Sequence, residues 1–156
     1  MATAALLAVS SLRAAAPAQA SAYCTKNEKS LPTPGYNTDF DVWVCATGGS
    51  YSHHGAYLVV GWTDGGDSAT DGDRKFDGLV VHLRVERYDA DYVKDSWSLA
   101  GLVNRNEHGT WTSPIIEATS TLRGGWTGDG YVKYDMDRDG EGWQDAWSLK
   151  GSPMVY

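Results

Sequence analysis

Residues 79–88 constrain the fold of this chain more than any other stretch, because apolar and polar side chains alternate along 81–86. The alternating set is apolar Val81, Leu83 and Val85 against polar His82, Arg84 and Glu86. A period of two is typical of a β-strand with one buried face and one wet face, as in antiparallel sheets. The stretch therefore predicts an antiparallel sheet with one face on a hydrophobic core.

Short apolar or alternating segments predict further strands. The clearest are residues 40–45, 56–62, 110–112 and 115–122, and another strand is predicted to begin at Ser96. The segment 25–38 holds two prolines among polar residues and is predicted to be a loop. No helical period is visible after residue 22. Seven to nine short strands with glycine-rich turns predict an all-β fold, an antiparallel β-sandwich or barrel.

The first 22 residues have a different composition from the rest of the chain. Ala, Leu and Val dominate, and 18–20 and 20–22 fit the small-x-small pattern of a secretory cleavage site. No basic residue precedes the apolar run, so an amphipathic N-terminal helix stays open as an alternative. We predict a signal peptide over 1–22 and a single secreted, extracellular domain over 23–156. No later run reaches about 18 apolar residues, which argues against a membrane span.

Cys24 and Cys45 are the two cysteines of the chain. Export favours a disulfide between them. A metal pair is the alternative, but the Cys-x-x-Cys spacing is absent. The disulfide should fasten the start of the domain to the strand predicted at 40–45.

The charge balance is acidic, with 13 Lys and Arg against 20 Asp and Glu. Removal of the predicted leader takes away Arg13, which leaves 12 against 20 and a net charge of −8. Nucleic acid and anionic membranes would be repelled by this charge. Cations, neutral glycans and basic partners remain compatible with it, and the oligomeric state is left open.

Two stretches of the chain repeat the same pattern. Each has Tyr-Asp-x-Asp followed by Asp-x-Trp-Ser-Leu-x-Gly, beginning at Tyr88 and at Tyr134. The tyrosines are 46 positions apart and the tryptophans, Trp97 and Trp147, are 50 apart. The repeat predicts a duplicated hairpin, with chance recurrence of strand composition as the alternative.

In the second copy Asp139-Gly140 favours a type I′ hairpin turn. That turn would pair Met136 with Trp143 and Val132 with Trp147, and so place these tryptophans and Trp97 in the core. Four carboxylates would then point outward: Asp135 and Asp137, with Asp89 and Asp91 as their counterparts.

The same segment resembles the opening half of a calcium loop, D-x-D-x-D-G. Alternate oxygen ligands can wrap a hard cation, and the glycine permits the sharp turn. The candidate ligands are Asp135, Asp137, Asp139 and Glu141. Position twelve of such a loop, where an EF-hand has a bidentate acid, is Ala146 here. Calcium is therefore an optional cofactor, and the plain hairpin turn competes with it for Asp139.

Seven tryptophans and nine tyrosines are a large aromatic surplus. Aromatic side chains fill cores by default, but exposed ones form stacking platforms. Trp111 and Trp126 are the candidates for a ligand platform, with Asp89 and Asp91 to bind sugar hydroxyls.

The leading functional prediction is a secreted, non-enzymatic domain that binds a glycan or cell-surface ligand, with calcium as an optional aid. An alternative is a protein-binding module, such as an inhibitor of an extracellular enzyme, acting through loop 63–78 or 104–113. A small acid/base hydrolase with paired carboxylates such as Asp89 and Asp135 is the third possibility. No catalytic constellation supports that third possibility, so the sequence favours a non-enzyme.

Overall fold

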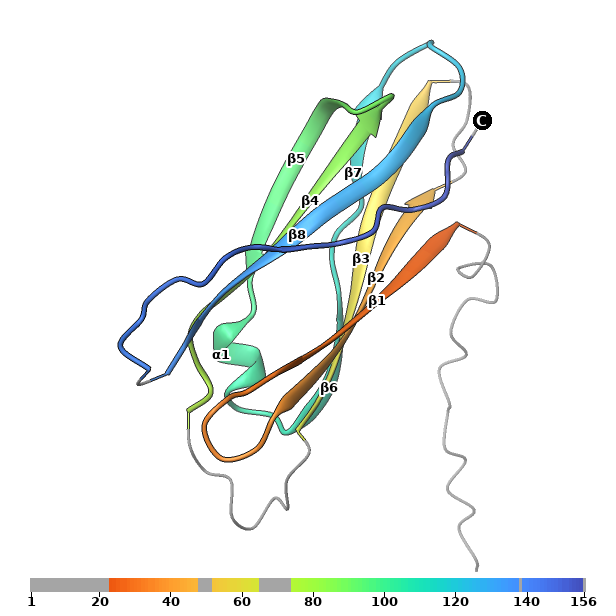
Figure 1. Ribbon diagram of the computed structural model, residues 1–156. Helices are drawn as coiled ribbons and strands as arrows, with labels where there is room; N and C mark the ends of the chain where they lie inside the picture. The colour runs from red at the N-terminus through yellow and green to blue at the C-terminus, as the bar shows by residue number, and fades with distance from the viewer. Residues whose placement is uncertain (1–22, 48–51, 65–73, 138, 156) are drawn as a thin grey trace, which may run out of the picture.

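Two antiparallel sheets face each other in the computed structural model of the chain (Figure 1). The model describes residues 23–47, 52–64, 74–137 and 139–155. The predicted signal peptide and residues 65–73 of the predicted loop 63–78 lie outside this range. In the part of the chain that is described, no helix has the length and apolar character needed to cross a bilayer.

The first sheet contains five strands in the order β1-β2-β3-β6, with β7 also paired to β3. Their bounds are β1 (Cys24–Leu31), β2 (Thr38–Thr47), β3 (His53–Asp64), β6 (His108–Thr112) and β7 (Ile116–Thr119). The second sheet has the order β5-β4-β8-β9. Its bounds are β4 (Phe76–Arg87), β5 (Ala90–Ser98), β8 (Trp126–Met136) and β9 (Trp147–Ser148), and one helical turn, α1 (Ala100–Val103), follows β5. The predicted all-β antiparallel sandwich, with nine strands, is confirmed.

The core lies between the facing sheets, and the inward side chains of residues 79–88 belong to it. Val81, Leu83 and Val85 are each 1% exposed. His82 and Arg84 are half-buried on the other face, whereas Glu86 is only 6% exposed. Burial of each such Val or Leu stabilises the fold by about 1.5–3 kcal/mol. The largest fully buried side chain is Trp126, which is 1% exposed and stacks on His54.

Side chains also close the sandwich along both edges. On one edge Asn27 of β1 donates to the carbonyl of Lys150 (3.2 Å) and accepts from the Lys150 N–H (2.6 Å). On the other edge Trp97 of β5 packs against Trp111 of β6, with ring centroids 5.6 Å apart. Contacts of this kind hold the two layers in a fixed relation, so the outward faces keep their shape.

The loop predicted over 25–38 is wrong for its first part, which forms β1. The strand is paired with β2 along its whole length and begins at the Cys24–Cys45 disulfide, where the two cysteines are register partners. Its polar composition suits an edge strand, because one side of such a strand faces water. The predicted disulfide is confirmed and contributes about 3 kcal/mol in the chain-entropy model.

The predicted start of a strand at Ser96 is also wrong, since Ser96 lies near the end of β5. This strand begins at Ala90, directly after a two-residue turn made by Tyr88 and Asp89. Both turn residues have positive φ, 48° and 64°, as a type I′ turn requires. Tyr88 is bulky for that conformation, but its N–H donates to the carbonyl of Gly125 (3.1 Å).

The expected type I′ turn at Asp139-Gly140 does not form, because Asp139 lacks a positive φ while Gly140 has 72°. Instead, Asp139 Oδ1 accepts a hydrogen bond from the Glu141 N–H (2.9 Å), which opens an irregular loop. The register of Val132 with Trp147 is as predicted. Trp143 is 54% exposed, so its predicted core position is wrong.

The two copies of the repeated motif occupy equivalent positions in the second sheet only in their second halves. Trp97, Val81, Val132 and Trp147 form one row across the four strands of the second sheet. The repeated tryptophans therefore occupy matching places on its two edge strands. The first halves do not match, because Tyr88 lies in a turn and Tyr134 lies inside β8.

Candidate functional site

The outward face of the β5-β4-β8-β9 sheet carries polar side chains from all four strands. Rows of residues run across it, because register partners on neighbouring strands point to the same side. One row consists of Ser96, His82, Tyr131 and Ser148. The next row, toward the β4–β5 turn, consists of Lys94, Arg84 and Asp129. The face is therefore a regular polar surface rather than a loop site.

An aromatic pair stands at the centre of this face. The rings of His82 and Tyr131 stack with centroids 4.2 Å apart and planes within 15°. Burial, together with the charge of Lys133, holds the pKa of His82 below its usual value of 6.5. The imidazole is therefore neutral at pH 7 and retains one donor and one acceptor nitrogen.

Grooves lie on both sides of Tyr131. The larger encloses about 530 Å³, and the residues that matter for binding along it are His82, Arg84, Asp91, Lys94, Ser96 and Tyr131. The smaller encloses about 260 Å³ between Tyr131, Lys133 and Ser148. Arg84, Gly130 and Tyr131 line both grooves. Tyr131 thus lies between two grooves, of which the larger has the volume of a ligand pocket.

A charged network borders the larger groove. The guanidinium of Arg84 reaches Glu86 (2.7 Å), Asp91 (3.6 Å) and Asp129 (2.5 Å). The hydrogen bond to Asp129 raises the pKa of Arg84, so the cation is permanent. Three carboxylates around one cation leave an excess of negative charge.

Glu86 is the group in this network whose protonation responds to pH. Burial raises its pKa to about 7, Arg84 opposes the rise, and Asp129 and Asp91 add to it. A pKa near 7 is what a general acid needs. The side chain, however, is only 8% exposed, which favours a structural role. The acid/base hydrolase stays a prediction, and an assay of polysaccharide hydrolysis with the native chain and Glu86→Gln would test it.

The structure separates the four residues predicted to bind ligand. Asp91 lines the larger groove, while Asp89 lies in the β4–β5 turn. Trp111 is half-buried against Trp97. Trp126 is a core residue whose indole N–H donates to the carbonyl of Leu122 (2.8 Å), so it is not offered to a ligand. A joint platform of Trp111 and Trp126 is absent from the described residues.

The four candidate metal ligands lie where β8 ends and in the loop that follows it. Asp137 is buried near Arg74 (3.8 Å), and Asp139 and Glu141 are exposed. Partial burial and the charges of Asp77 and Asp139 raise the pKa of Asp135. Within the described residues, no group of three or more His, Cys, Asp or Glu is placed to hold a metal ion. Calcium binding at this end therefore stays a prediction.

Sequence reasoning missed the centre of the face, which is made by Tyr131, His82, Arg84 and Asp129. The alternation of residues 79–88 predicts that His82 and Arg84 face outward, but it does not give their register with Tyr131 and Asp129 on the neighbouring strand. No known family model matches the chain, and no curated protein matches it either. The case for a binding site therefore depends on the geometry of this face.

Proposed function

We propose that the protein is an exported, non-enzymatic binding module whose outward β5-β4-β8-β9 face takes a glycan. The observation that carries the proposal is the stacked pair of His82 and Tyr131 between two open grooves. Aromatic rings offer a flat apolar surface to the C–H face of a sugar. Serines and carboxylates beside them can bind hydroxyl groups.

A second exposed aromatic extends the same face. The ring of Trp143 lies so close over Gly78 that a Cβ there would come within 2.4 Å of it. Gly78 and His82 are four positions apart along β4, which corresponds to about 13 Å at roughly 3.3 Å per residue. Trp143 and Tyr131 are therefore far enough apart to contact different rings of one oligosaccharide.

Secretion and calcium belong to the same proposal. The Cys24–Cys45 disulfide is consistent with an extracellular location, where such bonds persist. Export would be tested by expressing the chain with its first 22 residues and assaying the culture medium. A cation bound near Asp135, one of the four predicted ligands, would offset the charges of Asp77 and Asp139, which together with burial raise the pKa of Asp135.

The glycan proposal is tested by affinity electrophoresis against a panel of soluble polysaccharides. Tyr131→Ala should weaken binding about tenfold, equivalent to about 1.4 kcal/mol. Tyr36→Ala is the matched control, because Tyr36 is an exposed tyrosine on the β1–β2 connection. Equal retention of the two variants, or no retention of the native chain by any polysaccharide, would contradict the proposal.

A second candidate function is protein binding at the end of the sandwich that carries the β4–β5 turn. Tyr88, Tyr92 and Leu122 are all exposed there, and Tyr88 is 63% exposed. Arg87 lies 4.8 Å over the ring of Tyr88 and donates to the carbonyl of Gly124 (3.0 Å). Exposed tyrosine and arginine held in a fixed geometry are typical of protein-binding hot spots.

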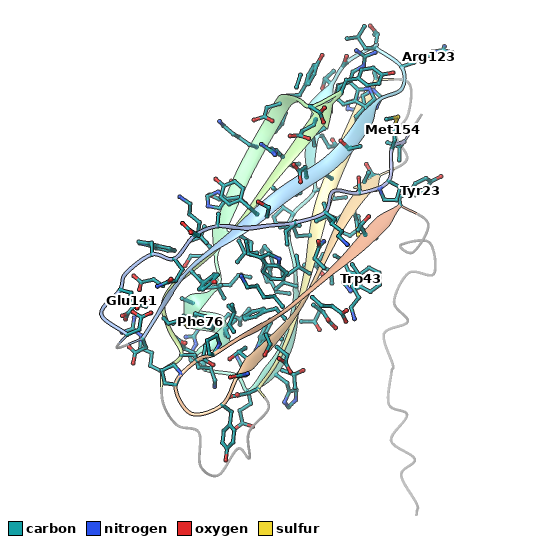
Figure 2. The ribbon with its side chains drawn as sticks, viewed as in Figure 1. Tyr23, Trp43, Phe76, Arg123, Glu141 and Met154 are labelled. Atoms are coloured by element: carbon teal, nitrogen blue, oxygen red, sulfur yellow. A yellow bond between two sulfur atoms is a disulfide. The ribbon has the colours of Figure 1, made fainter. Side chains whose placement is uncertain are left out.

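This end is remote from the candidate calcium ligands, as the positions of Arg123 and Glu141 in Figure 2 show. The loop at 63–78, proposed above as an inhibitory loop, has residues 65–73 outside the described range. Inhibition of a panel of extracellular proteases and glycosidases would test this second candidate. Tyr88→Ala should abolish any inhibition that Tyr36→Ala leaves intact, and inhibition unchanged by Tyr88→Ala would exclude this surface.

A further inference from the structure

Asp64 and Lys75 form an ion pair where the chain passes from one sheet to the other. Asp64 is the last residue of β3, and Lys75 directly precedes β4. Lys75 Nζ lies 2.5 Å from Asp64 Oδ2, and the two side chains are 4% and 2% exposed. The two groups are therefore in contact and almost completely removed from water.

The surroundings give the carboxylate of Asp64 little support. Among the described residues, neither of its oxygens accepts a hydrogen bond in a favourable geometry. A buried ion pair is stable only when hydrogen bonds also satisfy its remaining lone pairs, because burial costs each charge its hydration. An uncharged bond between the two groups would remove this cost of burying two charges.

We propose that Lys75 and Asp64 join covalently, through an intramolecular amide between Lys75 Nζ and Asp64 Cγ. Because Cγ is bonded to Oδ2, the reacting carbon lies close to the amine without any movement of the strands. Holding two reactants at contact distance replaces an encounter in solution and supplies a large effective concentration. The dry setting also excludes the water that would favour separate amine and acid.

The reaction balances without an oxidant or a further reactant. Transfer of one proton from the ammonium of Lys75 to the carboxylate of Asp64 gives a neutral amine and a neutral acid. The nitrogen lone pair attacks Cγ and forms the C–N bond. The C–O bond to the protonated oxygen then breaks, and this oxygen leaves as water with a proton from nitrogen. The product is one neutral amide and one water molecule.

Position in the fold gives this bond a consequence. β3 belongs to the five-stranded sheet and β4 to the four-stranded sheet, so the amide would connect the two layers directly. Cys24–Cys45 fastens strands within one sheet, so it cannot do the same. The two bonds would protect different parts of an extracellular module.

The chain contains its own control for proximity alone. Lys26 Nζ lies 2.6 Å from Glu28 Oε1, but these side chains are 35% and 68% exposed. Water surrounds this pair and satisfies both charges, so no amide is expected there. A modification found at Lys75 and absent at Lys26 would show that burial matters as well as distance.

Mass spectrometry of the full chain, denatured and with its disulfide reduced, tests the proposal. The native chain should weigh about 18 Da less than its sequence, the mass of one water molecule. Fragmentation should recover one branched peptide that contains both Asp64 and Lys75. Asp64→Asn should lose ammonia instead and reach the same final mass, while Lys75→Arg should keep its full mass.

Asp64 precedes Gly65, and an Asp-Gly pair can also lose water by closing a succinimide on its own backbone. Lys75→Arg separates the two explanations, since it removes the amine and leaves the Asp-Gly pair intact. A native chain at its full sequence mass would overturn the proposal. So would a loss of water that persists in Lys75→Arg. Where a variant does not fold, the branched peptide of the native chain decides the matter, because a succinimide at Asp64-Gly65 loses the same water and gives no branched peptide.

Discussion

Glu86→Gln should change the pH dependence of stability. Burial raises the pKa of Glu86 to about 7, and in the unfolded chain the group has its ordinary value of 4.5. The folded protein therefore holds this proton more tightly than the unfolded chain does. The resulting stabilisation is fully present below pH 4.5 and is lost as the pH rises through about 7.

The size of the effect follows from the two pKa values. Their difference, at about 1.4 kcal/mol per pH unit, corresponds to roughly 3 kcal/mol of folding free energy. Glutamine has the shape of the protonated acid and does not ionise. The stability of the native chain minus that of Glu86→Gln should therefore fall by about 3 kcal/mol between about pH 4 and about pH 8.5. Titrating groups that do not interact with Glu86 cancel in this difference.

Urea unfolding followed by tryptophan fluorescence measures both proteins at each pH. Glu117→Gln is the matched control, because Glu117 is exposed on β7 and its difference from the native chain should stay flat. A difference for Glu86→Gln that is equally flat would refute the reasoning. A native chain that gains stability over the variant at high pH would refute it as well, since the sign would be reversed.

Three further changes test other parts of the structure. Trp126→Ala removes the largest fully buried side chain and should lower the free energy of unfolding by about 3–5 kcal/mol in urea melts. Reduction of Cys24–Cys45 should lower it by about 3 kcal/mol, provided that the unfolded chain gains the full loop entropy. Millimolar calcium should raise the melting temperature of the native chain and not that of Asp135→Asn/Asp139→Asn, and an unchanged native melting temperature would remove calcium from the proposed function.

Much of the fold could be predicted because alternation survives in the buried strands. The alternation in residues 79–88 predicts both faces of β4. The predicted pairing of Val132 with Trp147 is also observed, although the two-residue turn from which it was counted does not form. β1 was missed because an edge strand can be polar on most positions and still pair along its length. The position of Trp143 was missed because a hydrogen bond from the backbone N–H of Glu141 to the carboxylate of Asp139 replaced the expected turn.

The site was harder to predict than the fold, because its residues meet only through strand pairing. Arg84 and Asp129 are separated by 45 positions in sequence, yet they form an ion pair across neighbouring strands. Asp91 was selected as part of a repeated motif and does line the larger groove. The motif does not explain this position, since its counterpart Asp137 is buried at the other end of the sheet. A sequence pattern can identify outward positions, but it cannot give the register that joins them.

The repeat and the proposed site have separate roles in the second sheet. Trp97 and Trp147 flank Val81 and Val132 in one row. The sheet therefore has an approximate two-fold symmetry about the middle of this row, which we call the frame. The rows on either side of this frame differ, because one carries His82 with Tyr131 and the other carries Val80 with Lys133.

If the frame has only a structural role and the differing rows determine binding, the stacked pair should also work when it is moved from the row of His82 and Tyr131 to the row of Val80 and Lys133. Val80→Tyr/Lys133→His would build the same pair in the neighbouring row, at outward positions that cost the core nothing. The double variant should fold with a melting temperature near that of the native chain and should bind polysaccharide even when Tyr131 is replaced by Ala. A folded double variant that lacks this rescue would mean that binding depends on more than the stacked pair.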